Sequence, residues 1–172
     1  MDERFVREVP NEIIGGLREI GKGFECLGKF TSGVTIVTYQ GAQGPTGLTV
    51  NLFVPVSLDP PIVLISIEKF AKAYQELESK PFTVNILHEE QEKLALHFGG
   101  RHQDKLSIEW SLGDASPRLK ESLAYLECTP RQYMDLGDHR QYIGNVEQFA
   151  YSEKAPLTYF SGLSGQFTES NV

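Results

Sequence analysis

The stretch that decides the fold is residues 33–61, GVTIVTYQGAQGPTGLTVNLFVPVSLDPP, because it holds two strand patterns joined by glycines. Residues 34–39 are mostly β-branched or aromatic, a composition that favours a strand. Residues 48–54 alternate apolar side chains with others, as a half-buried strand does. Glycines over residues 41–47 predict a turn, and Asp59-Pro60-Pro61 ends the second strand. The stretch therefore predicts a β-hairpin.

One face of the predicted second strand is unusual. Thr49, Asn51 and Phe53 would share it, opposite an apolar face made of Leu48, Val50, Leu52 and Val54. Small hydrogen-bonding groups beside glycines, which let backbone approach a ligand, are compatible with a binding wall. An ordinary hairpin with a solvated face has the same pattern, and this stretch alone slightly favours that interpretation.

Composition narrows the class of protein. The chain has 172 residues, which predicts a single domain over 1–172, with a loose arm at 1–11 and a tail at 162–172. Its net charge is −7 without a concentrated basic patch, so we expect no nucleic-acid partner. Apolar runs are too short for a membrane span. The two cysteines, Cys26 and Cys128, lie far apart, which favours a reducing, cytoplasmic location.

The remaining patterns predict a mainly β fold. Helices are expected at 12–27, 71–79 and 89–98, and further strands at 62–67, 82–87, 124–130, 131–136, 141–149 and 157–160. The strands at 124–130 and 131–136 are candidates to pair with each other. Because strands and helices do not alternate regularly, we predict a mostly antiparallel β-barrel with peripheral helices.

Several catalytic motifs are excluded. Gly41, Gly44 and Gly47 have the wrong spacing for a dinucleotide fingerprint, and a strand follows them instead of a helix. Residues 162–165, GLSG, are no nucleophile elbow, and the four histidines lack zinc-site spacing. We therefore predict no catalytic nucleophile, no acid–base pair and no metal site.

Three polar residues stand at places where a ligand could lie. Ser57 precedes the double proline, Lys72 begins a predicted short helix, and His139 follows a Gly-Asp turn between two strands. Each has an ordinary alternative as a turn or solvated residue. Functional residues, however, concentrate on loops held by a scaffold, and an ammonium group suits a phosphate.

These pieces occur in an order that resembles the flavin reductase-like family, whose fold is the FMN-binding split β-barrel of Greek-key type. The resemblance covers roughly residues 30–162. It rests on the segments GVTIVT, TGLTVNLFVPVSLDPPIVLISI, PFTVNIL, QEKLALHFGG, LECTPRQYMDLGDHRQYIGNV and APLTYFSG taken together.

The resemblance implies a homodimer with FMN or FAD at the subunit interface and hydride transfer from NADH or NADPH to the flavin. The chain would then be a flavin reductase, either one that supplies reduced flavin to a partner monooxygenase or one that passes electrons to another acceptor. It implies flavin contacts from Thr46, Gly47, Leu48, Thr49, Asn51, Val56, Ser57, Ser66, Ile67, Lys72, Phe98 and Tyr159. His139 matches the family's histidine on the nicotinamide side.

Two departures from the family pattern affect the cofactor. Pro55 stands where many members have a serine and has no N–H to donate. Lys72 stands where a small hydroxyl is common, so the choice between FMN and FAD stays open. The alternative function is a flavin-binding electron-transfer protein, or a flavin-dependent reductase of another acceptor, without direct use of nicotinamide.

Overall fold

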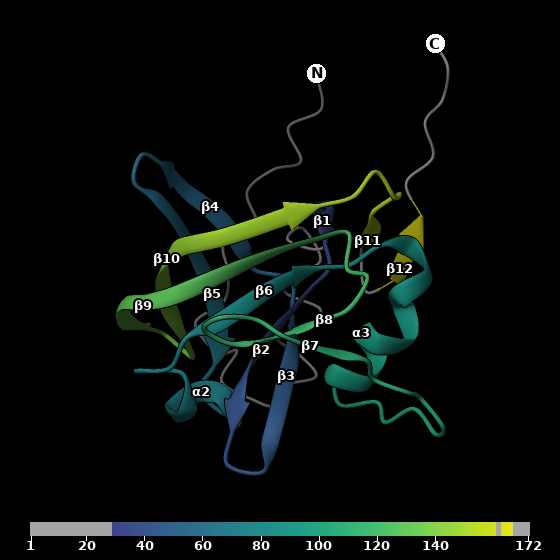
Figure 1. The fold of residues 1–172 in the computed structure, drawn as a ribbon, viewed down its shortest axis with the longest axis horizontal. Helices are drawn as coiled ribbons and strands as arrows, with labels where there is room; N and C mark the ends of the chain where they lie inside the picture. The colour runs from purple at the N-terminus through teal and green to yellow at the C-terminus, as the bar shows by residue number, and fades with distance from the viewer. Residues whose placement is uncertain (1–28, 161–162, 167–172) are drawn as a thin grey trace, which may run out of the picture.

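A seven-stranded antiparallel sheet organises the described residues, 29–160 and 163–166, in the computed structural model of the chain (Figure 1). In spatial order its strands are β3 (Gly44–Val50), β2 (Thr35–Gly41), β6 (Phe82–Ile86), β9 (Ala124–Leu136), β10 (His139–Tyr151), β5 (Pro61–Glu68) and β4 (Phe53–Leu58). Its edge strands, β3 and β4, do not pair with each other, so the sheet is not a closed barrel. The prediction of a mainly β fold with peripheral helices is confirmed.

Shorter elements surround this sheet. They are a three-stranded sheet of β1 (Ser32–Gly33), β11 (Leu157–Phe160) and β12 (Leu163–Gln166), a ribbon of β7 (Trp110–Leu112) and β8 (Pro117–Leu119), and the helices α2 (Ala73–Glu76), η2 (Glu89–Gln91) and α3 (Glu92–Phe98). The predicted arm at 1–11 and helix at 12–27 lie outside the described residues, and of the predicted tail only β12 is described. None of the described helices is long and apolar enough to cross a membrane.

The predicted hairpin is present, with a tighter turn than expected. β2 and β3 pair from Thr35 and Val50 up to Gly41 and Gly44, which leaves Ala42 and Gln43 as the connection. Gly44 has φ of 121°, a conformation that favours glycine. Residues 45–47, expected in the turn, instead extend β3, because the backbone of β2 pairs with them.

The predicted strand at 48–54 is wrong in its second half. The chain leaves β3 after Val50 and begins β4 at Phe53. Such a break resets the alternation of side chains, which normally places every second residue on one face. Phe53 accordingly packs against the core, while Leu52 and Val54, expected on the apolar face, are 50% and 48% exposed.

The predicted strands at 124–130 and 131–136 are one strand, β9, so the suggested pairing between them is wrong. Both halves pair with β10 instead, around a turn at Gly137 and Asp138. Register shifts near Gly144 and near Val146 bend this long hairpin. At its open end the hairpin pairs through β9 with β6, and at its turn end it pairs through β10 with β5.

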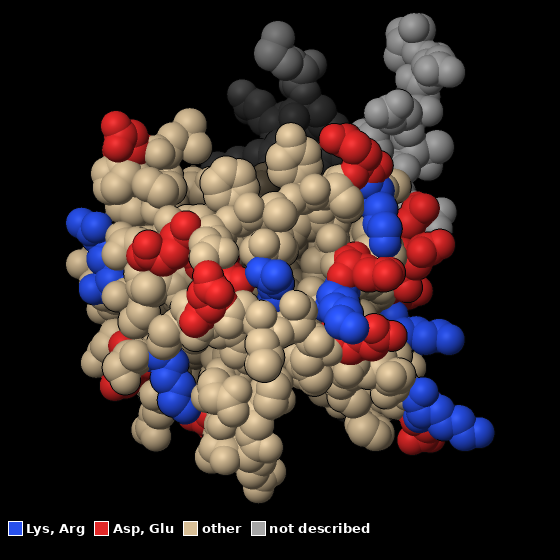
Figure 2. Space-filling model, in the orientation of Figure 1, with Lys and Arg blue, Asp and Glu red and all other residues tan. Residues whose placement is uncertain are grey.

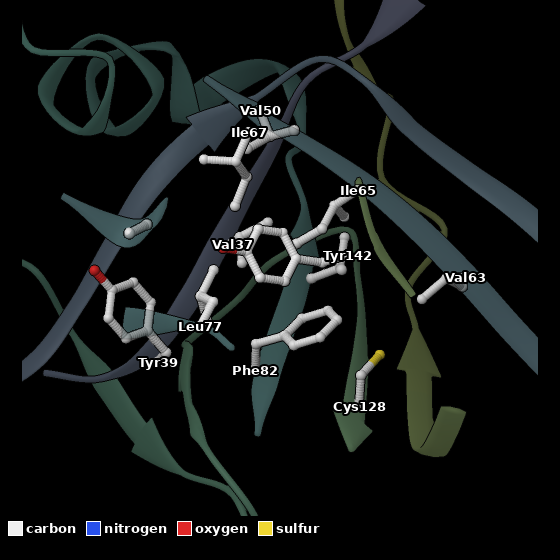
Figure 3. Packing of buried hydrophobic residues seen from close by; sticks show 12 residues of the cluster. Val37, Tyr39, Val50, Val63, Ile65, Ile67, Leu77, Phe82, Cys128 and Tyr142 are labelled. Carbon is white, nitrogen blue, oxygen red and sulfur yellow. The ribbon is translucent and has the colours of Figure 1, made fainter. Parts of the chain in front are cut away.

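The main core lies against the centre of the sheet (Figure 3). Phe82 from β6 packs among Val37, Ile65, Cys128 and Tyr142, all of them buried. Asn85, the odd polar residue of β6, is also fully buried, where it donates to Ile36 O at 2.9 Å and accepts from Leu119 N at 2.9 Å. Because both ends of the amide are satisfied, a polar side chain is tolerated in the sheet interior.

Candidate functional site

Two adjoining grooves lie where β3, the start of α2, the end of α3 and the start of β10 meet. The larger has a volume of about 750 Å³ and the smaller about 320 Å³. Leu48, Ala71 and Phe98 line both, so we treat them together as the joint groove. Ten of the predicted site residues line it, namely Thr46, Gly47, Leu48, Thr49, Asn51, Ser66, Ile67, Lys72, Phe98 and His139.

One wall of the joint groove is the edge strand β3. Among the strands that the structure describes, β3 pairs only with β2, so its outer N–H and C=O groups have no strand partner within residues 29–160 and 163–166. Residues 33–58 contain no charged side chain, and Figure 2 shows the projecting β2–β3 hairpin as an uncharged part of the surface. The wall therefore offers backbone donors and acceptors together with small side chains, which suits a flat polar ring.

Gly47 serves this wall through packing. A Cβ there would lie 2.9 Å from Val37 O, closer than real Cβ contacts allow. Its missing side chain thus lets β3 lie close to β2. The close approach predicted for the glycines is, at Gly47, an approach to the neighbouring strand.

Helix α3 forms the opposite wall and is fastened to β3. The Thr49 hydroxyl donates to Ala95 O at 2.7 Å. Thr49 was predicted to offer a small polar contact, but this hydroxyl already has its acceptor in α3. The Phe98 ring lies at the end of the helix, edge-on to Trp110 with 6.1 Å between ring centroids. The tie holds Phe98 facing β3 across the joint groove.

The floor comes from β5. Ser66 is 8% exposed, and its Oγ accepts a hydrogen bond from Gln141 Nε2 at 2.8 Å. The Ile67 side chain is buried in the core, which leaves its backbone for the joint groove. Gln141 was not predicted, although its two-residue spacing from His139 on β10 places both on one face of the strand.

Three charged side chains are among the described residues that line the joint groove, and one of them, Glu76, has a buried carboxylate oxygen. Lys72 is exposed beside Glu76, and Glu68 lies at the other end, near His139. Burial, and then the negative charge of Glu76, raise the pKa of Tyr39 to about 12, so this phenol is neutral at neutral pH. Among the described lining residues, the one lysine or arginine is Lys72, at the end nearer the β2–β3 turn.

His139 begins β10 at the far end of the joint groove. Its Nδ1 lies 2.7 Å from Asp138 Oδ1, and this hydrogen bond lowers the pKa of the Asp138 carboxyl. Of its two ring nitrogens, Nδ1 is therefore engaged. Nε2 has no hydrogen bond within the part of the chain that the structure describes, so it is the nitrogen available to a ligand.

Three predicted residues do not line the joint groove. Val56 and Ser57 lie on the edge strand β4. Tyr159 lies on β11 and packs against a smaller buried cluster made of Val34, Ile36, Leu87, Leu119 and Leu157. The family resemblance is what groups them with the site. Within a single chain the sheet carries β4 to the edge opposite β3.

The structure adds lining residues that the sequence did not indicate. They are Tyr39, residues 41–45, Val50, Leu52, Glu68, Ala71, Ala73, Glu76, Gly99 and Gly100. Ala71 is the most central of them because both grooves share it. A small side chain there was the only available signal, and alanine is too common for that signal to be specific.

Comparison with known proteins gives matches over most of the chain. Residues 27–167 match the model of the flavin reductase like domain. The NADH-dependent flavin reductase of a Rhodococcus species is 38% identical over 80% of this chain and 81% of its own. The reductase component of 4-hydroxyphenylacetate 3-monooxygenase from Thermus thermophilus is 36% identical over 79% of this chain and 89% of its own.

A solved structure agrees with these matches. The NADH:FAD oxidoreductase of Streptomyces globisporus, in complex with NAD and FAD fragments, superposes with a TM-score of 0.80 at 32% identity, over 88% of this chain and 94% of that one. Sequence and fold therefore agree over the same residues that build the joint groove, and the chain belongs to the flavin reductase-like family.

Proposed function

We propose that the protein is an NADH-dependent flavin reductase that transfers hydride from the nicotinamide to FMN or FAD held in the joint groove. The observation that carries this proposal is the convergence of ten predicted residues on one groove between β3, α2, α3 and β10. Its larger part alone, about 750 Å³, is within the size range of cofactor sites. The relatives named as NADH-dependent reductases support the same reaction.

The residues present fit a flavin. The free edge of β3 over residues 46–49 would face the polar edge of the ring, with Asn51 at its end and Phe98 across the joint groove. Lys72 would meet the phosphate at the end nearer the β2–β3 turn, and Ser66 with the Ile67 backbone would line the other end, near His139. The small side chain of Ala71 leaves room for a planar group where the two grooves join.

When bound, a flavin supplies the redox chemistry, since it takes a hydride from reduced nicotinamide and passes the electrons on. The chain's own task is then to orient two rings and to keep water away from them. Phe98, Leu48 and Ala71 provide apolar surface at the junction of the two grooves. His139 is placed to donate or accept through Nε2 at the nicotinamide end.

We further propose a homodimer that covers one end of the joint groove. The edge strand β4 exposes Val54, Val56 and Leu58, which are 48%, 54% and 92% exposed. Leu52 joins this apolar surface to the joint groove, because it is 50% exposed and also lines it. A second copy on β4 would bury these side chains. Val56 and Ser57 would then face the partner rather than the groove of their own chain. Light scattering of the purified protein is expected to give the mass of two chains.

A partner monooxygenase is proposed as the acceptor of reduced flavin. The Thermus relative is the reductase component of such an enzyme, which supports this assignment. We also propose a cytoplasmic location, consistent with the free, buried thiol of Cys128.

The reaction is tested directly with purified protein. Given FMN or FAD, it should oxidise NADH, seen as loss of nicotinamide absorbance well above a protein-free control. Protein that binds flavin and is reduced by dithionite, but by neither NADH nor NADPH, would instead indicate the electron-transfer alternative. No flavin binding at all would reject both assignments.

Lys72→Gln is expected to weaken FMN binding by about three- to tenfold, because it removes the cation nearest the proposed phosphate. Riboflavin, which lacks the phosphate, should bind as before. Flavin fluorescence titrations at two salt concentrations measure both affinities, and salt should reduce the difference. Lys93→Gln, an exposed lysine of α3 that does not line the joint groove, is the control. An equal loss for riboflavin would contradict the role of Lys72.

His139→Ala is expected to raise the KM for NADH about tenfold, as for one lost hydrogen bond, and to change FMN affinity by less than about twofold. Steady-state kinetics and FMN titration separate the two effects. His102→Ala, at an exposed histidine beyond α3, is the matched control. An unchanged KM would return His139 to the role of a turn residue.

A further inference from the structure

Arg140 is a buried cation whose partners come from β9 and from the segment that contains α2. Its side chain is 8% exposed. Nε donates to Asp135 Oδ1 at 2.5 Å and Nη2 to Asp135 Oδ2 at 3.2 Å, both on β9. Nη1 pairs with Glu78, just after α2, and Nη2 donates to the Tyr74 hydroxyl at 2.6 Å. The guanidinium also lies between two aromatic rings, 3.9 Å from the centroid of Tyr74 and 4.4 Å from that of Tyr133.

On one side this network fixes the segment that carries Lys72. Tyr74 and Glu78 flank Arg140, and Lys72 is two residues before Tyr74. The Tyr142 hydroxyl adds a hydrogen bond to Tyr74 O. Because Ala71, Lys72 and Ala73 line the joint groove, the position of α2 sets the position of this rim.

The hydrogen-bond network of Arg140 also fixes the position of His139. Arg140 is the next residue of β10, and neighbouring side chains of a strand point to opposite faces. Arg140 faces α2, while His139 lines the joint groove. A second tie runs parallel, since Lys69 Nζ donates to Gly137 O at 2.9 Å and Lys69 N to Asp138 O at 3.0 Å. The turn before His139 is thus held to the same segment that leads into α2.

The chemistry of the network suits positioning better than stability. Burying an arginine with carboxylates generally stabilises a fold no more than apolar residues of similar volume do. What a guanidinium adds is five donors in a fixed fork, which define direction as well as distance. Its hydrogen bond lowers the pKa of Asp135, so the carboxylate stays charged and the bonds persist well below neutral pH.

We propose that Arg140 is a positioning residue that holds Lys72 and His139 at a fixed separation across the joint groove. The inference rests on the proposed function, because those two residues are assigned to the flavin phosphate and to the nicotinamide. Displacing either group by about 1 Å is enough to weaken the contact that it would make with its ligand. Loss of the guanidinium should therefore affect both ends of the joint groove at once, although Arg140 touches neither ligand.

The test compares Arg140→Met, which keeps much of the volume and removes the fork, with Arg140→Lys, which keeps the charge. Arg140→Met should raise both the Kd for FMN and the KM for NADH about tenfold while kcat at saturation falls less. Riboflavin affinity should fall less than FMN affinity. Arg140→Lys should restore part of both values. Arg131→Met, on the exposed stretch of β9, is the control and should change neither.

Hydrogen exchange of the ligand-free protein separates this inference from the proposed function. Arg140→Met should increase exchange in residues 69–78 and 133–140 and leave the centre of the sheet unchanged. If the wild-type protein does not oxidise NADH, the proposed function fails and exchange alone still decides whether Arg140 fixes these segments. Unchanged exchange there, or faster exchange with unchanged Kd and KM in an active enzyme, would overturn the proposal. Should Arg140→Met not fold, Glu78→Gln removes the charge of only one partner of Arg140, leaves Tyr74 and Asp135 in place, and should give the same effects at smaller size.

Discussion

Ala71→Trp is expected to weaken flavin binding about 100-fold, equivalent to about 3 kcal/mol, and to abolish NADH oxidation at ordinary flavin concentrations. Ala71 lines both grooves where they join, between Leu48 of β3 and Phe98 of α3. An indole there would occupy the space assigned to the flavin ring. The backbone should tolerate the change, because the N–H of Ala71 keeps its bond to Glu68 O. Flavin fluorescence titration and NADH consumption measure the two losses.

The control for this substitution is Gln75→Trp. Gln75 is exposed on α2 and does not line either groove, so the same side chain should leave flavin affinity within about twofold of wild type. Both variants should retain the thermal transition of the wild-type protein. If Ala71→Trp still bound flavin normally, the joint groove would not be the flavin site, whatever the protein's activity.

Phe82→Ala is expected to lower the free energy of unfolding by about 3 to 5 kcal/mol, a large part of the stability of an ordinary domain. The ring is 1% exposed at the centre of the core, among side chains of β2, β5, β9 and β10 (Figure 3). A methyl group on Gly144 would lie 2.7 Å from its Cζ, so the ring fills the space that this glycine leaves. Its removal creates a cavity that the paired strands cannot collapse to fill. Urea unfolding measures the loss.

Two further variants test the explanation by packing. Phe70→Ala removes a ring that is 89% exposed and should change stability by less than about 0.5 kcal/mol. Adding Gly144→Ala to Phe82→Ala should recover part of the loss, although the same alanine alone should destabilise the protein. A loss below about 1 kcal/mol for Phe82→Ala would show that the sheet repacks around the gap.

Much of the fold could be predicted from local patterns. The hairpin of β2 and β3, the apolar strand β5, the strand β6 and the helix at α3 are each set by neighbouring residues, whose periodicity fixes which element forms. The break between Val50 and Phe53 could not be predicted, because alternation continues unbroken in the sequence. Only pairing with two different strands, β2 and β5, divides it. The same applies to β9, whose two apparent strands are joined by their common partner β10.

The candidate site, like the fold, could be predicted from the sequence only in part. The sequence by itself determined the chemical character of the β3 wall, because a stretch without charges between glycines offers backbone and small polar groups in any fold. It also indicated Lys72 and His139 as candidates. Only the tertiary structure decided that they face the same groove, that Ala71 joins its two parts, and that Thr49 is already bonded to α3. It also placed Val56 and Ser57 on the opposite edge of the sheet. The physical reason is that residue type and spacing act over a few positions, whereas a groove depends on which distant strands pair and on how a helix docks against them.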